Sequence, residues 1–226
     1  MRAFLDLVLP AHCAGCNLPS VLACTTCLAP LTAPPRPAWP RPSPPGLPPP
    51  FAVAAYDGSV RRLLLAFKEE GVVGLGPSLG RALACAVVAA LGANDVVRLV
   101  PVPSSAASRR QRGQDIVRAL AGTAARDLRR LGLDAVVVPA LRHARRVQDS
   151  AGLTSRERAA NLMDAFFVRP RRVEALAGHP VVLVDDLITT GVTLAECAAA
   201  LRREGSPPLA CATIAATQRR LIASDR

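Results

Sequence analysis

The sequence predicts an α/β protein with a mostly parallel sheet flanked by helices and a small N-terminal zinc ribbon. Half of the 226 residues are hydrophobic. Short apolar runs alternate with segments of helical spacing, which is typical of parallel strands covered on both faces. Four of the seven cysteines precede residue 28. We therefore divide the chain into a four-cysteine module (1–33), a proline-rich linker (34–50) and an α/β domain (51–226).

Apolar spacing defines the elements of the third region. Residues 59–69 place Val60, Leu63, Leu64 and Phe67 on one helical face. A pattern of the same kind predicts the other helices, and apolar runs bounded by polar, glycine or proline residues predict the strands. In order, we expect a strand at 51–57, helices at 59–69 and 76–91, a strand at 95–103, a helix at 113–131, strands at 134–141 and 179–186, a helix at 193–205 and a strand at 209–217.

The N-terminal cysteines form two pairs, Cys13-x-x-Cys16 and Cys24-x-x-Cys27. Two paired thiols at this spacing suit tetrahedral zinc. Gly15, inside the first pair, favours a tight turn, and so short a segment needs the metal to fold. The alternative is a pair of redox or unpaired Cys-x-x-Cys motifs. The remaining cysteines lie in apolar patterns and are predicted core residues: Cys85, Cys197 and Cys211.

Residues 34–50 read "PPRPAWPRPSPPGLPPP". Proline fixes φ and lacks an amide donor, so we expect no sheet pairing or helix here. The composition predicts an extended, semi-rigid polyproline spacer. A proline-rich ligand for a partner is the alternative.

The formal net charge is +11, and Lys68 is the only lysine among the 28 basic residues. A basic balance favours anionic partners such as nucleic acid, membrane surfaces or phosphorylated metabolites. Coding bias in a GC-rich genome is the alternative explanation. The longest apolar run, 82–93, is too short to span a bilayer. We therefore expect a cytoplasmic protein without membrane insertion.

The stretch 181–191, "VVLVDDLITTG", ends an apolar strand with Asp185 and Asp186. Ligands of open parallel sheets bind beyond the carboxyl ends of the strands. The Thr-Thr-Gly turn leads into a helix whose N-terminus suits a phosphate, and the two carboxylates suit vicinal hydroxyls or water-bound Mg²⁺. A ribose 5-phosphate unit matches all of these groups. The alternative is a capping box between Thr193 and Glu196, which is compatible with phosphate binding.

The stretch 181–193 closely resembles the phosphoribosyl-pyrophosphate (PRPP) loop of type I phosphoribosyltransferases. Three further segments resemble ComF-like proteins, which are linked to DNA uptake and also carry a four-cysteine element: "LLLAFKEEG" with Lys68, "VPVPSSAASRRQRGQD", and "RRVQDSAGLTSRERAANLMDAF". The second departs from the family pattern at Asp115-Ile116 and the third at Asp164.

The resemblance implies roles for particular residues. Asp185 and Asp186 would hold the ribose hydroxyls of Mg²⁺-PRPP. The loop around the 5-phosphate would comprise Leu187, Ile188, Thr189, Thr190, Gly191, Val192 and Thr193. Contacts to pyrophosphate or from the mobile loop would come from Ser104, Ser105, Arg109, Arg112, Gln148 and Arg158.

Two functions follow as hypotheses. The first is a phosphoribosyltransferase that transfers the phosphoribosyl group to an unknown nitrogenous acceptor and releases pyrophosphate, with homodimers as a further expectation. The second is a non-catalytic competence protein that binds single-stranded DNA and keeps the PRPP site as a sensor or relic. Aromatic residues make up only 3% of the chain, which weakens the second hypothesis because single-strand binding uses stacking platforms. Trp39 is its one candidate. His143 and His179 are expected to be structural or exposed.

Overall fold

The protein is described by a computed structural model that covers residues 12–104, 115–144 and 165–217. It contains a six-stranded sheet and a separate two-stranded sheet. The N-terminal and first-half elements are α2 (Thr25–Leu28), η1 (Ala29–Thr32), β1 (Arg36–Pro37), β2 (Pro50–Ala55), α3 (Gly58–Lys68), η2 (Val73–Leu75), α4 (Gly76–Leu91) and β3 (Val96–Pro101). The later elements are α6 (Ile116–Arg130), β4 (Asp134–Val137), β5 (Leu141–His143), β6 (Phe166–Val168), α8 (Pro170–Val173), β7 (Val181–Ile188), α9 (Val192–Arg203) and β8 (Pro208–Ala216).

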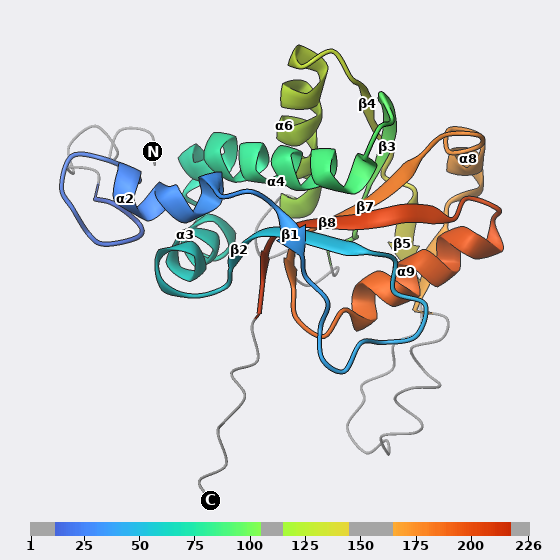
Figure 1. The fold of residues 1–226 in the computed structure, drawn as a ribbon, viewed down its shortest axis with the longest axis horizontal. Coiled ribbons are helices and arrows are strands. Elements are labelled where there is room, and N and C mark those ends of the chain that lie inside the picture. The colour runs from blue at the N-terminus through green and yellow to red at the C-terminus, as the bar shows by residue number, and fades with distance from the viewer. Residues whose placement is uncertain (1–11, 105–114, 145–164, 218–226) are drawn as a thin grey trace, which may run out of the picture.

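The main sheet has the strand order β1-β2-β8-β7-β3-β4. Every pair from β2 to β4 is parallel, and only β1 is antiparallel to its neighbour. The predicted fold class is therefore confirmed. The chain runs outward from β3 to β4 through α6, and from β7 to β8 in the opposite direction through α9 (Figure 1). The order of the strands thus reverses between β3 and β7.

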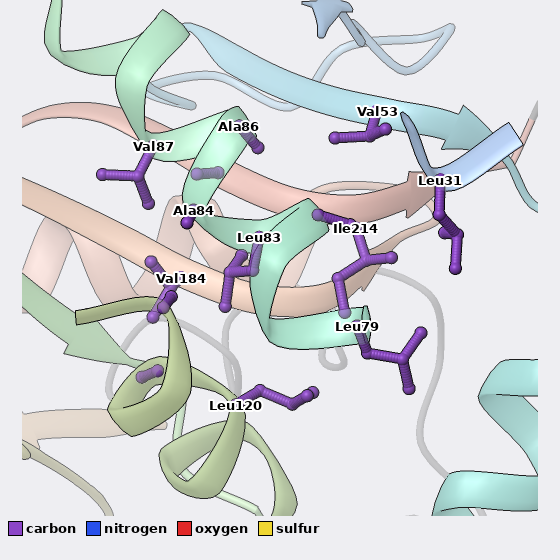
Figure 2. Close-up of a cluster of buried hydrophobic side chains, with 14 of the residues drawn as sticks. Leu31, Val53, Leu79, Leu83, Ala84, Ala86, Val87, Leu120, Val184 and Ile214 are labelled. Atoms are coloured by element: carbon purple, nitrogen blue, oxygen red, sulfur yellow. The ribbon is translucent and has the colours of Figure 1, made fainter. Parts of the chain in front are cut away.

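Two hydrophobic cores cover the two faces of this sheet. One is formed with α3, α4 and α6, and the other with α9 and the β5–β6 sheet. Figure 1 shows α4 and α6 on one side of the sheet and α9 on the other. Figure 2 shows Leu79 and Leu83 of α4 in one cluster with the strand residues Val184 and Ile214 and with Leu120 of α6. Branched aliphatic side chains fill this space, as the shortage of aromatic residues requires.

One stretch of the described chain, Val73–Leu91, is long and apolar enough to cross a membrane by length and composition. It comprises η2 and α4, and 56% of its most apolar window is buried inside the protein. Because α4 packs against the sheet and α6, this stretch has the surroundings of a core helix.

Three strands differ from the predictions. The strand expected at 134–141 is divided between β4 of the main sheet and β5, which pairs antiparallel with β6. The β6 strand was not predicted, because its three residues are too few for a periodic pattern. β7 continues to Ile188, so Leu187 and Ile188 belong to the strand rather than to the turn.

The proline-rich segment (residues 34–50) takes part in the main sheet, so the expectation of no sheet pairing there is wrong. Arg36 and Pro37 form β1, paired with β2, and the Ala38 amide donates to the Pro50 carbonyl at 2.8 Å. Proline is tolerated here because β1 is an edge strand. Leu47 is buried against α9, and Arg202 of α9 donates from Nη2 to the Gly46 carbonyl at 2.7 Å.

The docking of the proline-rich segment leads to a stability prediction. Leu47→Ala should lower the free energy of unfolding by about 2–3 kcal/mol, because it removes a buried side chain and leaves a cavity. Urea denaturation measures the change. Leu131→Ala is the control: Leu131 is 70% exposed, so its loss should cost less than about 0.5 kcal/mol. Equal, small effects for both variants would mean that the segment is an extended spacer that does not depend on the packing of Leu47.

Candidate functional site

The acid pair lies where sheet topology favours a ligand. β7 ends at Ile188, and the preceding residues Asp185 and Asp186 lie near its carboxyl end. The neighbouring β3 runs in the same direction and leads into Val102, whose amide donates to the Val184 carbonyl at 2.9 Å. The strand order reverses between β3 and β7, and the helices that follow these strands, α6 and α9, lie on opposite faces of the sheet. Such a switch point is the usual place for a ligand in an open α/β sheet.

Asp186 is a buried carboxylate with a cationic partner. Its residue is 5% exposed, and its Oδ2 lies 2.5 Å from Nζ of Lys68, the last residue of α3. This contact lacks hydrogen-bond geometry, so Oδ2 has no hydrogen-bond donor within the described parts of the chain. The pairing was not predicted, although Lys68 was noted for its resemblance to a family motif. No local signal in the sequence connects residue 68 with residue 186.

Asp185 is partly buried and has no paired cation of its own among the described residues. Its Oδ1 accepts a hydrogen bond from the Asp186 amide at 2.9 Å. Burial raises the pKa of Asp185 well above its usual value of 3.8, and the negative charge of Asp186 raises it further. The Lys68 charge acts in the opposite direction but is the smaller influence. The two neighbouring carboxylates therefore repel each other. This repulsion costs folding free energy, and the strand would form without it.

The bend after β7 joins the strand to α9. Thr189, Thr190 and Gly191 connect the two elements, and Gly191 is the N-cap with φ 75°, in the left-handed region. The N-cap is Gly191, which has no side chain, and Thr193 lies inside α9, so Thr193 is not the cap that the capping box requires. In the described structure, the amides from Thr190 to Thr193 have no hydrogen-bond acceptor. These donors, together with the helix N-terminus, are suited to an anion.

Gly191 is held in place by the proline-rich segment. A Cβ at this position would lie 3.0 Å from Leu47 Cδ2 and 3.1 Å from Pro40 Cγ. Both the positive φ and this close approach require glycine. Leu47 and Pro40 therefore pack against the bend, although the sequence analysis assigned both to a spacer.

The loop after β3 is described as far as Ser104. The Ser104 hydroxyl donates to Asp115 Oδ1 at 3.2 Å, and the same oxygen accepts from the Arg118 amide, which caps α6. Asp115 thus has a structural role at the point where the sequence departs from the family pattern. The other predicted pyrophosphate and mobile-loop residues lie outside the described residues: Ser105, Arg109, Arg112, Gln148 and Arg158.

The two histidines make structural contacts, as predicted. His143 Nε2 donates to the Pro103 carbonyl at 2.9 Å, and its ring packs against Phe166 with centroids 4.7 Å apart. These contacts join the β5–β6 sheet to the loop after β3. His179 Nε2 lies 3.2 Å from Arg98 Nη2 on the exposed surface.

The four N-terminal cysteines converge. The Sγ atoms of Cys13, Cys16, Cys24 and Cys27 all lie within 4.8 Å of one another, and those of Cys16 and Cys24 are 3.7 Å apart. Four sulfurs around a tetrahedral zinc, at about 2.3 Å from the metal, are roughly 3.8 Å apart. The cluster therefore has the dimensions to bind a metal such as zinc.

The backbone around the cluster favours thiolate. The amides of Cys24 and Gly15 donate to Cys13 Sγ at 3.3 and 3.4 Å. Burial alone would raise the pKa of Cys13, but these amide donors outweigh it and lower the pKa to about 6. Burial and the neighbouring thiols raise the pKa of Cys27 to about 12. A Cβ at Gly15 would lie 2.5 Å from Cys27 Sγ, so only glycine fits inside the cluster.

The cysteine module is attached to α3. The Ser59 hydroxyl donates to the Cys27 carbonyl at 3.0 Å, and Arg62 Nε donates to the Gly15 carbonyl. Cys13, Cys27 and Leu31 belong to the same core as α4 and α6. Figure 1 shows α2 beside α3. The module is therefore docked on the α/β domain. Cys197 and Cys211 are buried core residues as predicted, whereas Cys85 is exposed.

Comparison with known proteins gives one family match. Residues 117–226 match the model described as a phosphoribosyl transferase domain. The matched part includes the acid pair and the bend, and the mostly parallel sheet flanked by helices is consistent with the type I phosphoribosyltransferase fold. Lys68 and the cysteine module lie outside it. None of the curated proteins compared with the chain matches.

The raised pKa of Asp185 predicts that its charge destabilises the folded chain. Folded Asp185 binds a proton more tightly than unfolded Asp185, so wild-type stability falls as pH rises from the usual value of 3.8 through the raised one. Asp185→Asn has no such titration. It should raise the Tm at pH 7.5 by about 3 °C, and the gain should disappear in acid.

Differential scanning calorimetry across this pH range tests the expectation. Asp134→Asn is the matched control, because Asp134 is an exposed residue at the opposite end of the sheet that pairs with Arg98. It should give no gain at any pH. A less stable Asp185→Asn variant at pH 7.5 would mean that the Asp185 charge is compensated in the folded chain.

A metal at the four thiols should be measurable as content and as stability. We expect one zinc per chain by elemental analysis, and its loss in Cys24→Ser. Removal with a chelator should lower the Tm by roughly 10 °C, because a tightly bound metal stabilises only the folded chain. Cys85→Ser, which alters a thiol outside the cluster, should keep both metal and Tm. Metal-free wild type with unchanged Tm would exclude a structural metal.

Proposed function

From the phosphoribosyl transferase domain match, we propose that the chain is a ComF-like phosphoribosyltransferase. It binds Mg²⁺-PRPP and transfers the phosphoribosyl group to a nitrogenous acceptor with release of pyrophosphate. One observation carries the proposal: an acid pair, a threonine–glycine bend and an uncapped helix start follow one another at the switch point of the sheet. This part of the chain lies within the family match.

The residues offer complementary groups for each part of PRPP. The carboxylates of Asp185 and Asp186 accept hydrogen bonds from the two ribose hydroxyls. The amides after Thr189, and the threonine hydroxyls beside them, donate to the 5-phosphate at the positive end of α9. Ser104, in the loop after β3, would contact pyrophosphate if its hydroxyl turned away from Asp115.

The donor set also fits Mg²⁺. Oxygen ligands and retained waters are what this cation prefers, and the acid pair offers carboxylate oxygens at the edge of the sheet. When bound, Mg²⁺ would neutralise the pyrophosphate and make it a better leaving group. The protein's own share is to hold the ribose by Asp185 and Asp186 and to keep the 5-phosphate in the bend.

The reaction is a substitution at the anomeric carbon. A bond forms between the acceptor nitrogen and C1 of the ribose, the bond from C1 to the pyrophosphate oxygen breaks, and the acceptor nitrogen loses its proton. Positive charge builds on the ribose ring in the transition state, beside the carboxylates. Positioning and electrostatics suffice for such a step, and no protein nucleophile is required.

The four-cysteine module extends the proposal. We assign it structural Zn²⁺, because a segment with so small a core needs a metal to hold its turns. The ComF resemblance further associates the protein with DNA uptake. Zinc in this role would fix the module on α3 rather than take part in the transfer.

A second function rests on Trp39. Its side chain is 49% exposed on the proline-rich segment, where it offers a stacking surface for a base of single-stranded DNA. In this alternative the PRPP site is a sensor or a relic. Salt-dependent DNA binding that survives Asp185→Ala, together with no turnover of PRPP by any acceptor, would favour it.

The test of the transferase is binding followed by turnover. Isothermal titration should show Mg²⁺-dependent binding of PRPP to the wild type, and Asp186→Asn should weaken it at least tenfold, which is about 1.4 kcal/mol. Pyrophosphate release is then measured with PRPP, Mg²⁺, and a panel of purine and pyrimidine bases and ammonia.

Asp134→Asn again serves as the control and should bind PRPP like the wild type, because its carboxylate lies at the far end of the sheet. Circular dichroism establishes that each variant is folded. Absence of PRPP binding to the folded, Mg²⁺-supplied wild type would refute the proposed function.

A further inference from the structure

The buried ion pair between Lys68 and Asp186 is the strongest unassigned feature. Lys68 comes from α3, outside the family match, and reaches an aspartate of β7 within it. Its side chain is 26% exposed and that of Asp186 is 7% exposed. A charge as buried as Asp186 is expensive unless it is paired. The described residues provide no other ion pair or hydrogen bond for Asp186 Oδ2.

The charged groups around the acid pair identify Lys68 as the compensating cation. Asp185 lies close enough to Cys197 of α9 and Cys211 of β8 to raise the pKa of both thiols, after burial. Glu196 and Arg202 of α9 also influence those thiols, in opposite directions. From α3, Lys68 is the cation that contacts a member of the pair.

We propose that Lys68 is a positioning residue of the acid pair. Its ammonium group holds Asp186 by Oδ2 and compensates the buried charge, so that Oδ1 is left to accept a hydrogen bond from a hydroxyl of the bound sugar phosphate. This role rests on the proposed function, which supplies the ligand. Among the described residues outside the acid pair, none donates to Oδ1.

A lysine suits this position better than the arginines found elsewhere in the chain. An ammonium group is a compact point charge, whereas a guanidinium is a planar fork that would engage both carboxylate oxygens. A bidentate arginine would therefore occupy Oδ1 as well. A merely structural alternative exists, since a cation in the last turn of a helix stabilises the helix itself.

The ligand-free protein gives the first test. Lys68→Met keeps most of the aliphatic volume and leaves Asp186 without its cation. At pH 7.5 its Tm should fall by roughly 5 °C. Lys68→Arg should recover most of the Tm, because it restores a cation beside Asp186. In an Asp186→Asn background, which has no charge to compensate, Lys68→Met should cost much less; an equal loss of Tm in both backgrounds would indicate a packing or helix-end role and overturn the proposal.

PRPP binding gives the second test. By isothermal titration, Lys68→Met should bind Mg²⁺-PRPP about 10- to 100-fold more weakly, the usual effect of losing one hydrogen bond to a charged group. If turnover is found, the KM for PRPP should rise more than kcat falls. Lys68→Arg should recover only part of the lost affinity, because its fork would also engage Oδ1.

Arg61→Met is the matched control. It removes one positive charge from an exposed position of the same helix, so it should change neither the Tm nor the affinity. If the wild type binds PRPP and Lys68→Met binds it equally well, the positioning role is wrong and the proposed function stands. If the wild type binds no PRPP, the proposed function fails, and the ligand-free test alone decides whether Lys68 holds Asp186.

Discussion

The charge balance of the acid pair depends on the ion pair between Lys68 and Asp186. Two adjacent carboxylates at the end of a buried strand repel each other, and burial disfavours their charges. In the described structure one ammonium group, supplied by α3, offsets part of this cost. The remaining free-energy cost is borne by the charge of Asp185, because burial raises the pKa of this residue. A fold would not retain such an arrangement for stability, which is why the acid pair indicates function.

Helix α3 links the cysteine module to the acid pair. Its 11 residues span about 16 Å. Near the first turn, Ser59 and Arg62 donate to the carbonyls of Cys27 and Gly15, and at the last residue Lys68 contacts Asp186. A module too small to have a core of its own thus helps to set the position of the helix that carries the cation. The four thiols and the acid pair thus lie at opposite ends of the same helix.

Local patterns could be predicted from the sequence, and contacts between distant segments could not. The helix at 76–91 has the predicted bounds because its apolar residues recur with helical spacing. The acid pair and the bend were predictable because they are contiguous. The partner of Asp186 was not, since nothing near residue 68 indicates residue 186. β1 was missed because the rule against proline in strands is strict only for strands paired on both sides.

The bend itself shows how distant packing can replace a local signal. Gly191 adopts a left-handed conformation with no side-chain cap to stabilise it, and its amide and those of its neighbours have no acceptor in the described structure. Such a turn would relax if it were exposed. Instead Pro40 and Leu47 cover it, and Arg202 ties the same segment to α9. Apolar packing on one side therefore holds the amides in place, and the absence of a cap leaves them available. A capped helix start would be more stable and would bind an anion less well, so the two features together favour a ligand at this position.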